Sequence, residues 1–157
     1  MSYAVSVETP TTNARETTPA ATNASVHSSQ ISTAQVWAGR IVSGLAVLFL
    51  LFDASMKVLR LPVAVEGTVQ LGYPADVLVP LGIIQMGCLI LYLIPRISPL
   101  GAAMWTGYLG GAVATHVRMG DPLFTHVLFP VYVATMLWAG LWLRDARVRA
   151  LLAPRAR

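Results

Sequence analysis

Ionisable side chains interrupt stretches of this sequence that are otherwise apolar. Asp53 and Lys57 lie four residues apart near the end of one stretch, and His116 and His126 lie on either side of a predicted turn. An ionisable group is costly in hydrocarbon and therefore usually faces a partner or a cavity. Counting residues along the predicted helices puts Asp53 and both histidines at a similar depth. The pattern indicates proton handling or ligand binding at one end of a helix bundle.

Asp53, His116 and His126 would make a set of two imidazoles and one carboxylate, which can bind a transition metal. However, none of these residues has the local spacing of a metal motif such as HExxH. The single cysteine, Cys88, excludes patterns that need several cysteines, and it is most simply a buried small apolar group. We therefore predict no metal site.

Each candidate also has a structural interpretation. Asp53 and Lys57 have the spacing of a local ion pair on one helix. His116 and His126 could form a neutral hydrogen bond between neighbouring helices. For Asp53 and Lys57, the structural and functional interpretations both remain open. For the histidines, proton handling and ligand binding remain the alternatives.

Other polar residues lie above and below this predicted layer. Gln85 and Tyr108 are deeper and could form the floor of a pocket, whereas Arg118, Asp121 and Thr125 would line its rim. A glutamine in an apolar helix more often forms a hydrogen bond to another helix, and a tyrosine there more often packs. These interpretations do not exclude a ligand contact.

Four apolar stretches occupy most of the chain. Of the 157 residues, 55% are hydrophobic and 11% are charged, and the mean hydropathy is +0.63. A soluble domain usually has about 25% charged residues. A helix needs about 20 residues to cross about 30 Å of hydrocarbon, and stretches of this length without period-two alternation exclude β-barrel strands. The stretches are 36–59, 77–94, 97–117 and 122–143.

The predicted fold is all-α, an integral membrane up-down four-helix bundle over residues 35–144. Short connections make the last three helices antiparallel neighbours. An amphipathic segment between the first two predicts a short helix at the membrane interface. Residues 1–34, rich in Ser and Thr, are expected to be a disordered cytoplasmic tail, and 145–157 a basic cytoplasmic tail.

Charge predicts the orientation of this bundle. Eight of the eleven Lys and Arg residues lie on the side that holds both termini. Because basic residues near helix ends favour the cytoplasm, both termini of this multi-pass membrane protein are expected there. The basic tail is expected to contact anionic lipid headgroups of the bilayer, and no nucleic-acid partner is predicted.

Small residues recur at every fourth position of the third stretch. Gly107 and Gly111 form a GxxxG pattern, which lets two helix backbones approach closely in lipid. We favour a contact with another helix of the same chain, complemented by Gly39 and Ser43 of the first helix. A homo-oligomer interface is the alternative.

Several longer motifs form a recognisable set. They are Phe52-Asp53-Ala54-Ser55-Met56-Lys57, Leu71-Gly72-Tyr73-Pro74, Leu91-Tyr92-Leu93-Ile94-Pro95-Arg96, and the run from Gly107 to Arg118 followed by Gly120-Asp121-Pro122. Over about residues 37–152 they resemble the DoxX-like family. The resemblance implies a small bacterial inner-membrane protein with four transmembrane helices. Relatives of this kind are subunits associated with thiosulfate:quinone oxidoreductase and other membrane redox systems. No catalytic residue can be transferred from the family.

These observations favour an accessory subunit of a membrane redox system with an outward-facing polar pocket for a small lipophilic or quinone-like ligand. The side chains that would bind this ligand or handle its proton are Asp53, Lys57, Gln85, Tyr108, His116, Arg118 and His126. The expected partner is a membrane or peripheral redox protein. One alternative is a non-enzymatic scaffold or assembly protein that uses the Gly107 and Gly111 surface. Another is a small proton-coupled transporter.

Overall fold

The computed structural model describes residues 32–152, and within this range the regular structure is entirely helical. The helices, with η1 a 3-10 turn and η2 a π-helical turn, are α1 (Thr33–Val58), α2 (Pro62–Gln70), η1 (Ala75–Val77), α3 (Leu78–Leu93), α4 (Ser98–Met119), η2 (Leu123–Val127), α5 (Phe129–Arg144) and α6 (Ala146–Leu152). All but the last three residues of the expected N-terminal tail lie outside the described range, as do residues 153–157 of the basic tail.

Helix α1 begins three residues before the predicted boundary because Ser32 caps it. The Ser32 hydroxyl accepts a hydrogen bond from the Gln35 backbone N–H at 3.2 Å, and the Gln35 side chain accepts one from the Ser32 N–H at 3.1 Å. The exchange provides partners for two N–H groups that no carbonyl of the helix can reach. It therefore fixes the start of the first apolar segment.

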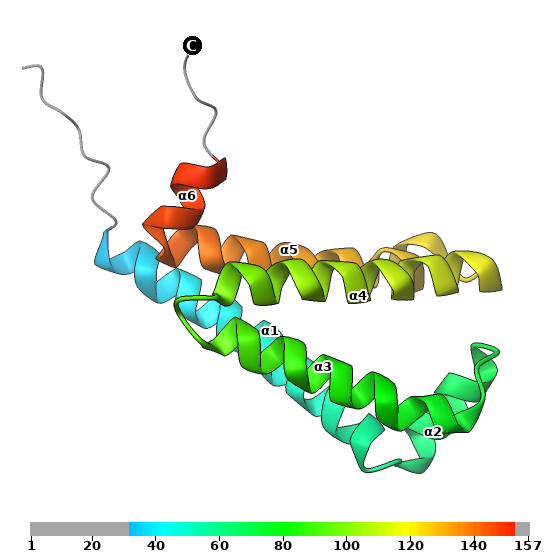
Figure 1. Ribbon diagram of the computed structural model, residues 1–157. Coiled ribbons are helices and arrows are strands. Elements are labelled where there is room, and N and C mark those ends of the chain that lie inside the picture. The colour runs from blue at the N-terminus through cyan, green and yellow to red at the C-terminus, as the bar shows by residue number, and fades with distance from the viewer. Residues whose placement is uncertain (1–31, 153–157) are drawn as a thin grey trace, which may run out of the picture. The chain divides into compact units, whose positions relative to one another are not determined.

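The four long helices pack as successive neighbours. Helix α1 contacts both α3 and α5, and α4 packs between α3 and α5 (Figure 1). Each contributes a large side chain to a common core, and these side chains, each at most 2% exposed, are Leu50, Tyr92, Trp105 and Leu137. The core thus joins all four helices.

Small residues allow two of these helix pairs to approach closely. A Cβ atom added at Gly140 of α5 would lie 2.2 Å from Ser43 Oγ of α1, and one at Gly39 would lie 2.9 Å from the Gly140 carbonyl oxygen. At the crossing of α3 and α4, a Cβ at Gly101 would lie 2.3 Å from the Tyr92 backbone nitrogen. A larger residue at these positions would force the helices apart.

The surface of the helices is strongly apolar. Leu48, Phe52, Ile83 and Phe124 are each at least 60% exposed, and many other large apolar side chains are exposed as well. Soluble monomers rarely expose contiguous apolar areas of this kind, whereas lipid-facing helices do. The exposed surface therefore suits a hydrocarbon environment.

Within residues 32–152, three segments are long and apolar enough to cross a membrane: Thr33–Val58, Ala75–Leu93 and Leu123–Arg144. Helix α4 coincides with the third predicted stretch and has 22 residues, but it is not among these three. Its many Gly and Ala residues lower its hydropathy without shortening it. The structure thus supports a helical membrane protein with three candidate spans.

Three local features differ from or refine the sequence prediction. The short helix expected between the first two long ones is present as α2 (Figure 1). The predicted continuous helix over 122–143 is interrupted, because η2 ends at Val127 and α5 begins at Phe129. Pro130, in the first turn of α5, has no N–H to continue the hydrogen-bond ladder of η2. Part of the expected basic tail forms α6.

Candidate ligand-binding site

One polar cluster joins α1 to α3. The Asp53 carboxylate is bonded to the Lys57 ammonium group one turn later on α1, and it also accepts a hydrogen bond from Gln85 Nε2 of α3 at 2.6 Å. The predicted ion pair and the predicted helix-to-helix bond of Gln85 are thus both confirmed. The carboxylate charge is balanced by one cation and one amide donor within the helices.

The amide of Gln85 retains an unused acceptor. Its side chain is only 2% exposed, and within residues 32–152 its Oε1 atom has no hydrogen-bond partner. The neighbouring carboxylate can only accept, so the amide must turn its nitrogen toward Asp53 and its oxygen away. A buried acceptor without a partner costs about 1–3 kcal/mol. This oxygen is therefore a place where a bound donor would be stabilised.

Tyr108 of α4 extends the same cluster. It lies close enough to the Asp53 carboxylate to be influenced by its charge, and its ring meets that of Trp105 edge to face, with the ring centres 5.6 Å apart. Trp105 is fully buried, and its Nε1–H donor also has no partner within the described residues. Tyr108 therefore packs against the core beside Trp105, whose N–H group has no partner among the described residues. Cys88, 2% exposed, is buried as predicted.

Tyr73, in the turn after α2, contacts α4 and was missed as a candidate by sequence reasoning. Its hydroxyl donates a 2.8 Å hydrogen bond to Thr115 Oγ1, because the Thr115 hydroxyl itself donates to the Gly111 carbonyl. The preceding Gly72 has a φ of 81°, a left-handed conformation that favours glycine. The Gly-Tyr-Pro turn was the only sequence signal for this position.

Arg118 ties this turn to the end of α4. Its Nη2 atom donates to the Leu71 carbonyl at 2.7 Å, and its guanidinium lies 5.3 Å from the centre of the Tyr73 ring. The predicted place of Arg118 at the rim of a pocket stays a prediction. The contacts of Arg118 are structural, since they hold the connection between α2 and α3 against α4.

The two histidines form a separate pair. Their rings meet edge to face at 5.9 Å, but no hydrogen bond joins them; the direct bond considered from sequence is therefore wrong. The ring nitrogen Nδ1 of His116 donates to the Asp121 carboxylate at 2.6 Å, and Nδ1 of His126 is 2.8 Å from Thr125 Oγ1. Each imidazole has a nearer partner of its own at the turn between the helices.

Asp53 contacts neither histidine through a hydrogen bond or an ion pair among the described residues. No group of three or more His, Cys, Asp or Glu side chains in residues 32–152 is arranged to hold a metal ion. The candidate residues therefore form two clusters, one built around Asp53 and Gln85 and the other around His116 and His126. A common recess for both clusters stays a prediction.

The favoured interpretation of Gly107 and Gly111 is wrong. A Cβ added at either residue would meet no atom within 4 Å, and both lie on the exposed face of α4. The small residues Gly39 and Ser43, expected to complement them, pack against Gly140 of α5 instead. GxxxG marks a helix surface that can be approached closely, but it does not identify the partner helix.

The helices, their apolar exterior and this internal polar cluster define a helical membrane protein. A family model for the DoxX-like family matches residues 41–140, well over half of the chain, and the protein belongs to that family. The matched range includes every residue of both polar clusters. No curated protein and no solved structure was found to be similar.

Proposed function

We propose that this DoxX-like protein is an accessory subunit of a membrane redox system and binds a small lipophilic molecule with a quinone-like head. The head would lie at the cluster of Asp53, Gln85 and Tyr108. The observation that carries this proposal is the buried Oε1 atom of Gln85, which has no hydrogen-bond partner in the part of the chain that the structure describes. The Asp53 carboxylate accepts a hydrogen bond from the Gln85 amide nitrogen, so the amide oxygen is already oriented before a ligand arrives.

A hydroquinone hydroxyl is a suitable donor for Gln85 Oε1. A quinone carbonyl is a suitable acceptor for the Trp105 N–H, which has no partner among residues 32–152. The ring itself is apolar and fits a core of aromatic and aliphatic side chains. Asp53, paired with Lys57, can take up or return a proton when the ligand changes state. The electrons would come from or go to the partner redox protein.

We further propose that α4 forms a fourth crossing, which completes an up-down four-helix bundle in the bacterial inner membrane with both termini in the cytoplasm. Its length and its packing between α3 and α5 support this arrangement. The excess of Lys and Arg on one side supports the orientation. The Asp53 cluster and the histidine pair would then open toward the outer face.

The test is binding of a short-tailed ubiquinone analogue, decylubiquinone in its reduced form, to the full chain purified in detergent. Tryptophan fluorescence provides the readout. Replacing Gln85 by leucine should weaken binding about tenfold or more, because a buried hydrogen-bond acceptor is lost. Replacing the exposed Gln70 by leucine is the matched control and should leave binding unchanged. No saturable binding by the wild-type chain, or equal affinity in both variants, would contradict the proposal.

A second candidate function is assembly of a membrane complex through the exposed face of α4. The supporting observation is the open space over Gly107 and Gly111. A Gly111→Leu variant should then lose association with a second copy or a membrane partner, measured by crosslinking in native membranes, whereas Gln85→Leu should not. If both variants crosslink like the wild type, this face has no partner.

A further inference from the structure

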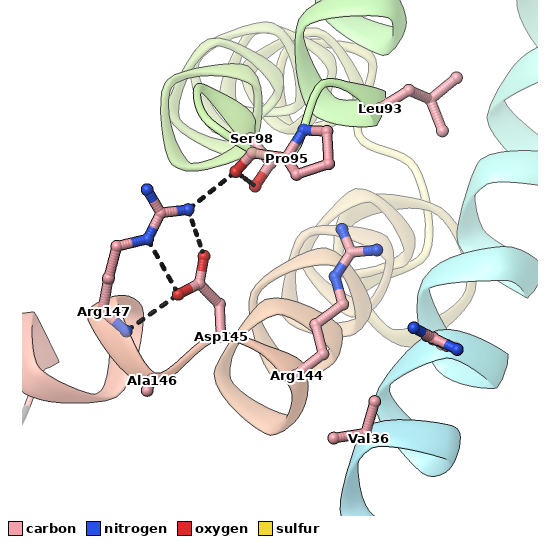
Figure 2. Close-up of a pocket in the computed structure, with 9 residues that line it drawn as sticks. Val36, Leu93, Pro95, Ser98, Arg144, Asp145, Ala146 and Arg147 are labelled. Carbon is pink, nitrogen blue, oxygen red and sulfur yellow. Dashed lines mark hydrogen bonds and ion pairs between the residues drawn. The ribbon is translucent and has the colours of Figure 1, made fainter.

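A second polar region lies at the opposite end of the helices, where sequence analysis identified no site. The first turns of α1, the end of α3 and the end of α5 surround a cavity of about 580 Å³. Ligand pockets in proteins usually have volumes of about 300–1,000 Å³. The cavity also adjoins the α3–α4 and α5–α6 connections. Its residues are Val36, Arg40, Leu93, Pro95, Ser98, Arg144, Asp145, Ala146 and Arg147 (Figure 2).

Three arginines and one carboxylate line this cavity, so the lining has an excess of positive charge. Arg147 is paired with Asp145, with its Nη2 atom 3.0 Å from Oδ2, and it also donates to the Pro95 carbonyl at 2.9 Å. Neither Arg40 nor Arg144 forms an ion pair with a carboxylate of residues 32–152. Two guanidinium groups therefore line the same cavity with their charges unbalanced by the described residues.

Aromatic rings position both of these guanidinium groups. Arg144 lies 5.3 Å from the centre of the Tyr92 ring, and Arg40 lies 5.6 Å from the centre of the Trp37 ring. Tyr92 is itself fixed, because its hydroxyl donates to the Leu137 carbonyl at 2.9 Å and is 3.1 Å from Ser43 Oγ. A cation held over a ring keeps its N–H groups free at the edge of the plane.

The paired Arg147 closes one side of the cavity, because it bridges the start of α6 to the α3–α4 connection (Figure 2). In the same view, the Arg144 side chain extends from α5 into the space between Val36 and Leu93. These two apolar side chains and Pro95 line the cavity beside the charges. A fitting ligand therefore combines an anionic group with an apolar part.

The three candidate spans have ends at Thr33, Leu93 and Arg144, which places the cavity where hydrocarbon meets water. Phosphate groups of lipids occupy that depth, and arginine binds phosphate through paired N–H donors. Basic pockets between helices at this level suit anionic headgroups. Arg40 and Arg144 lie outside the range that matches the DoxX-like family, residues 41–140, so the family match does not predict this pair.

We propose that Arg40 and Arg144 bind the phosphate of an anionic glycerophosphate group in this cavity, carried by a phospholipid or by a soluble glycerophosphate. The guanidinium groups hold the phosphate oxygens, and the apolar wall beside them accommodates the first carbons of an acyl chain. A headgroup with a quaternary ammonium binds less well, because its own cation opposes the arginines.

Native mass spectrometry of the full chain in detergent tests this site. The wild type is titrated with dioleoylphosphatidylglycerol and, separately, with dioleoylphosphatidylcholine. We expect tighter binding of the anionic lipid, and a loss of about tenfold to a hundredfold in its affinity when Arg144 is replaced by glutamine. Arg96→Gln is the matched control: Arg96 is exposed on the same α3–α4 connection but does not line the cavity, so its loss should change the affinity less than twofold.

A further titration with sn-glycerol 3-phosphate distinguishes the two sources of the phosphate. Displacement of the lipid at millimolar concentration would assign the site to a soluble glycerophosphate, and no displacement would assign it to the phospholipid; both support the phosphate site. Arg40→Gln, at an exposed position near the start of α1, tests the pair independently if Arg144→Gln does not fold. Equal binding of the two lipids, or an equal loss in the Arg96→Gln control, would overturn the proposal.

Discussion

Substitution of Gly101 by alanine tests the close crossing of α3 and α4. The added methyl group would lie 2.3 Å from the backbone nitrogen of Tyr92, 2.5 Å from its Cα and 2.7 Å from the carbonyl carbon of Leu91. Ordinary contacts begin near 3.4 Å, so the two helices would have to separate by about 1 Å. All three atoms belong to a helix backbone, which cannot rotate away as a flexible side chain can.

The expected magnitude follows from two opposing effects. Overpacking of a well-packed core costs about 1–3 kcal/mol, and a clash with backbone belongs at the upper end of that range. Replacing glycine by alanine in a helix gains up to about 1 kcal/mol in the absence of a clash. The net loss is about 2 kcal/mol in the free energy of unfolding, or roughly 30-fold in the ratio of folded to unfolded protein.

Equilibrium unfolding in mixed micelles, followed by circular dichroism, measures this difference. The control is Gly107→Ala on the same helix, where the added methyl group meets no atom within 4 Å. This variant should be as stable as the wild type or more stable by up to about 1 kcal/mol. If the Gly101→Ala and Gly107→Ala variants have the same free energy of unfolding, the close approach of α3 to α4 does not exist.

Three further predictions concern other parts of the chain. The hydrogen bond from Arg147 holds the pKa of the Asp145 carboxyl below its usual value. The Asp145–Arg147 pair therefore stabilises the fold above the usual pKa, and this stabilisation is lost as pH falls through the lowered pKa. Protease cleavage near α6 should increase below about pH 4 in the wild type, whereas an Asp145→Asn variant should already be cleaved at neutral pH and show no further increase. Arg118→Gln should speed amide hydrogen exchange in the turn after α2, because the bond to the Leu71 carbonyl is lost, while the exchange of α5 stays unchanged. Tyr92→Phe should lower the free energy of unfolding by about 1 kcal/mol, because it removes a buried hydroxyl with two hydrogen bonds; an unchanged value in chemical unfolding would refute this.

Contacts between residues near in sequence were predictable. The Asp53–Lys57 pair follows from a spacing of four on a helix, and the short α2 follows from an amphipathic segment between two longer ones. That Gln85 would form a hydrogen bond to another helix was also predicted, because an amide in an apolar helix needs a partner; the sequence did not identify Asp53 as that partner. Local periodicity carries this information without knowledge of the tertiary structure.

Contacts that depend on how the helices rotate about their axes were not predictable. The GxxxG pattern of Gly107 and Gly111 indicates a surface, but the rotation of α4 that exposes it depends on the packing of Trp105 and of the other core residues. The arginine-lined cavity was missed for a related reason. Arg40 and Arg144 come from opposite ends of the chain, and their charge pattern served only to predict orientation. Only the contact of α1 with α5 brings them together.

That contact also sets an order for biosynthesis. The ribosome completes α1 long before α5, yet the helix backbone that approaches Gly39 and Ser43 of α1 most closely is that of Gly140 in α5. Until translation reaches that residue, this small-residue part of α1 lacks the α5 backbone that packs against it and is open to lipid or to another protein. A nascent chain stalled before α5 should therefore stay crosslinkable through position 43 to lipid or to another protein, and this crosslink should be lost once the final long helix has been synthesised.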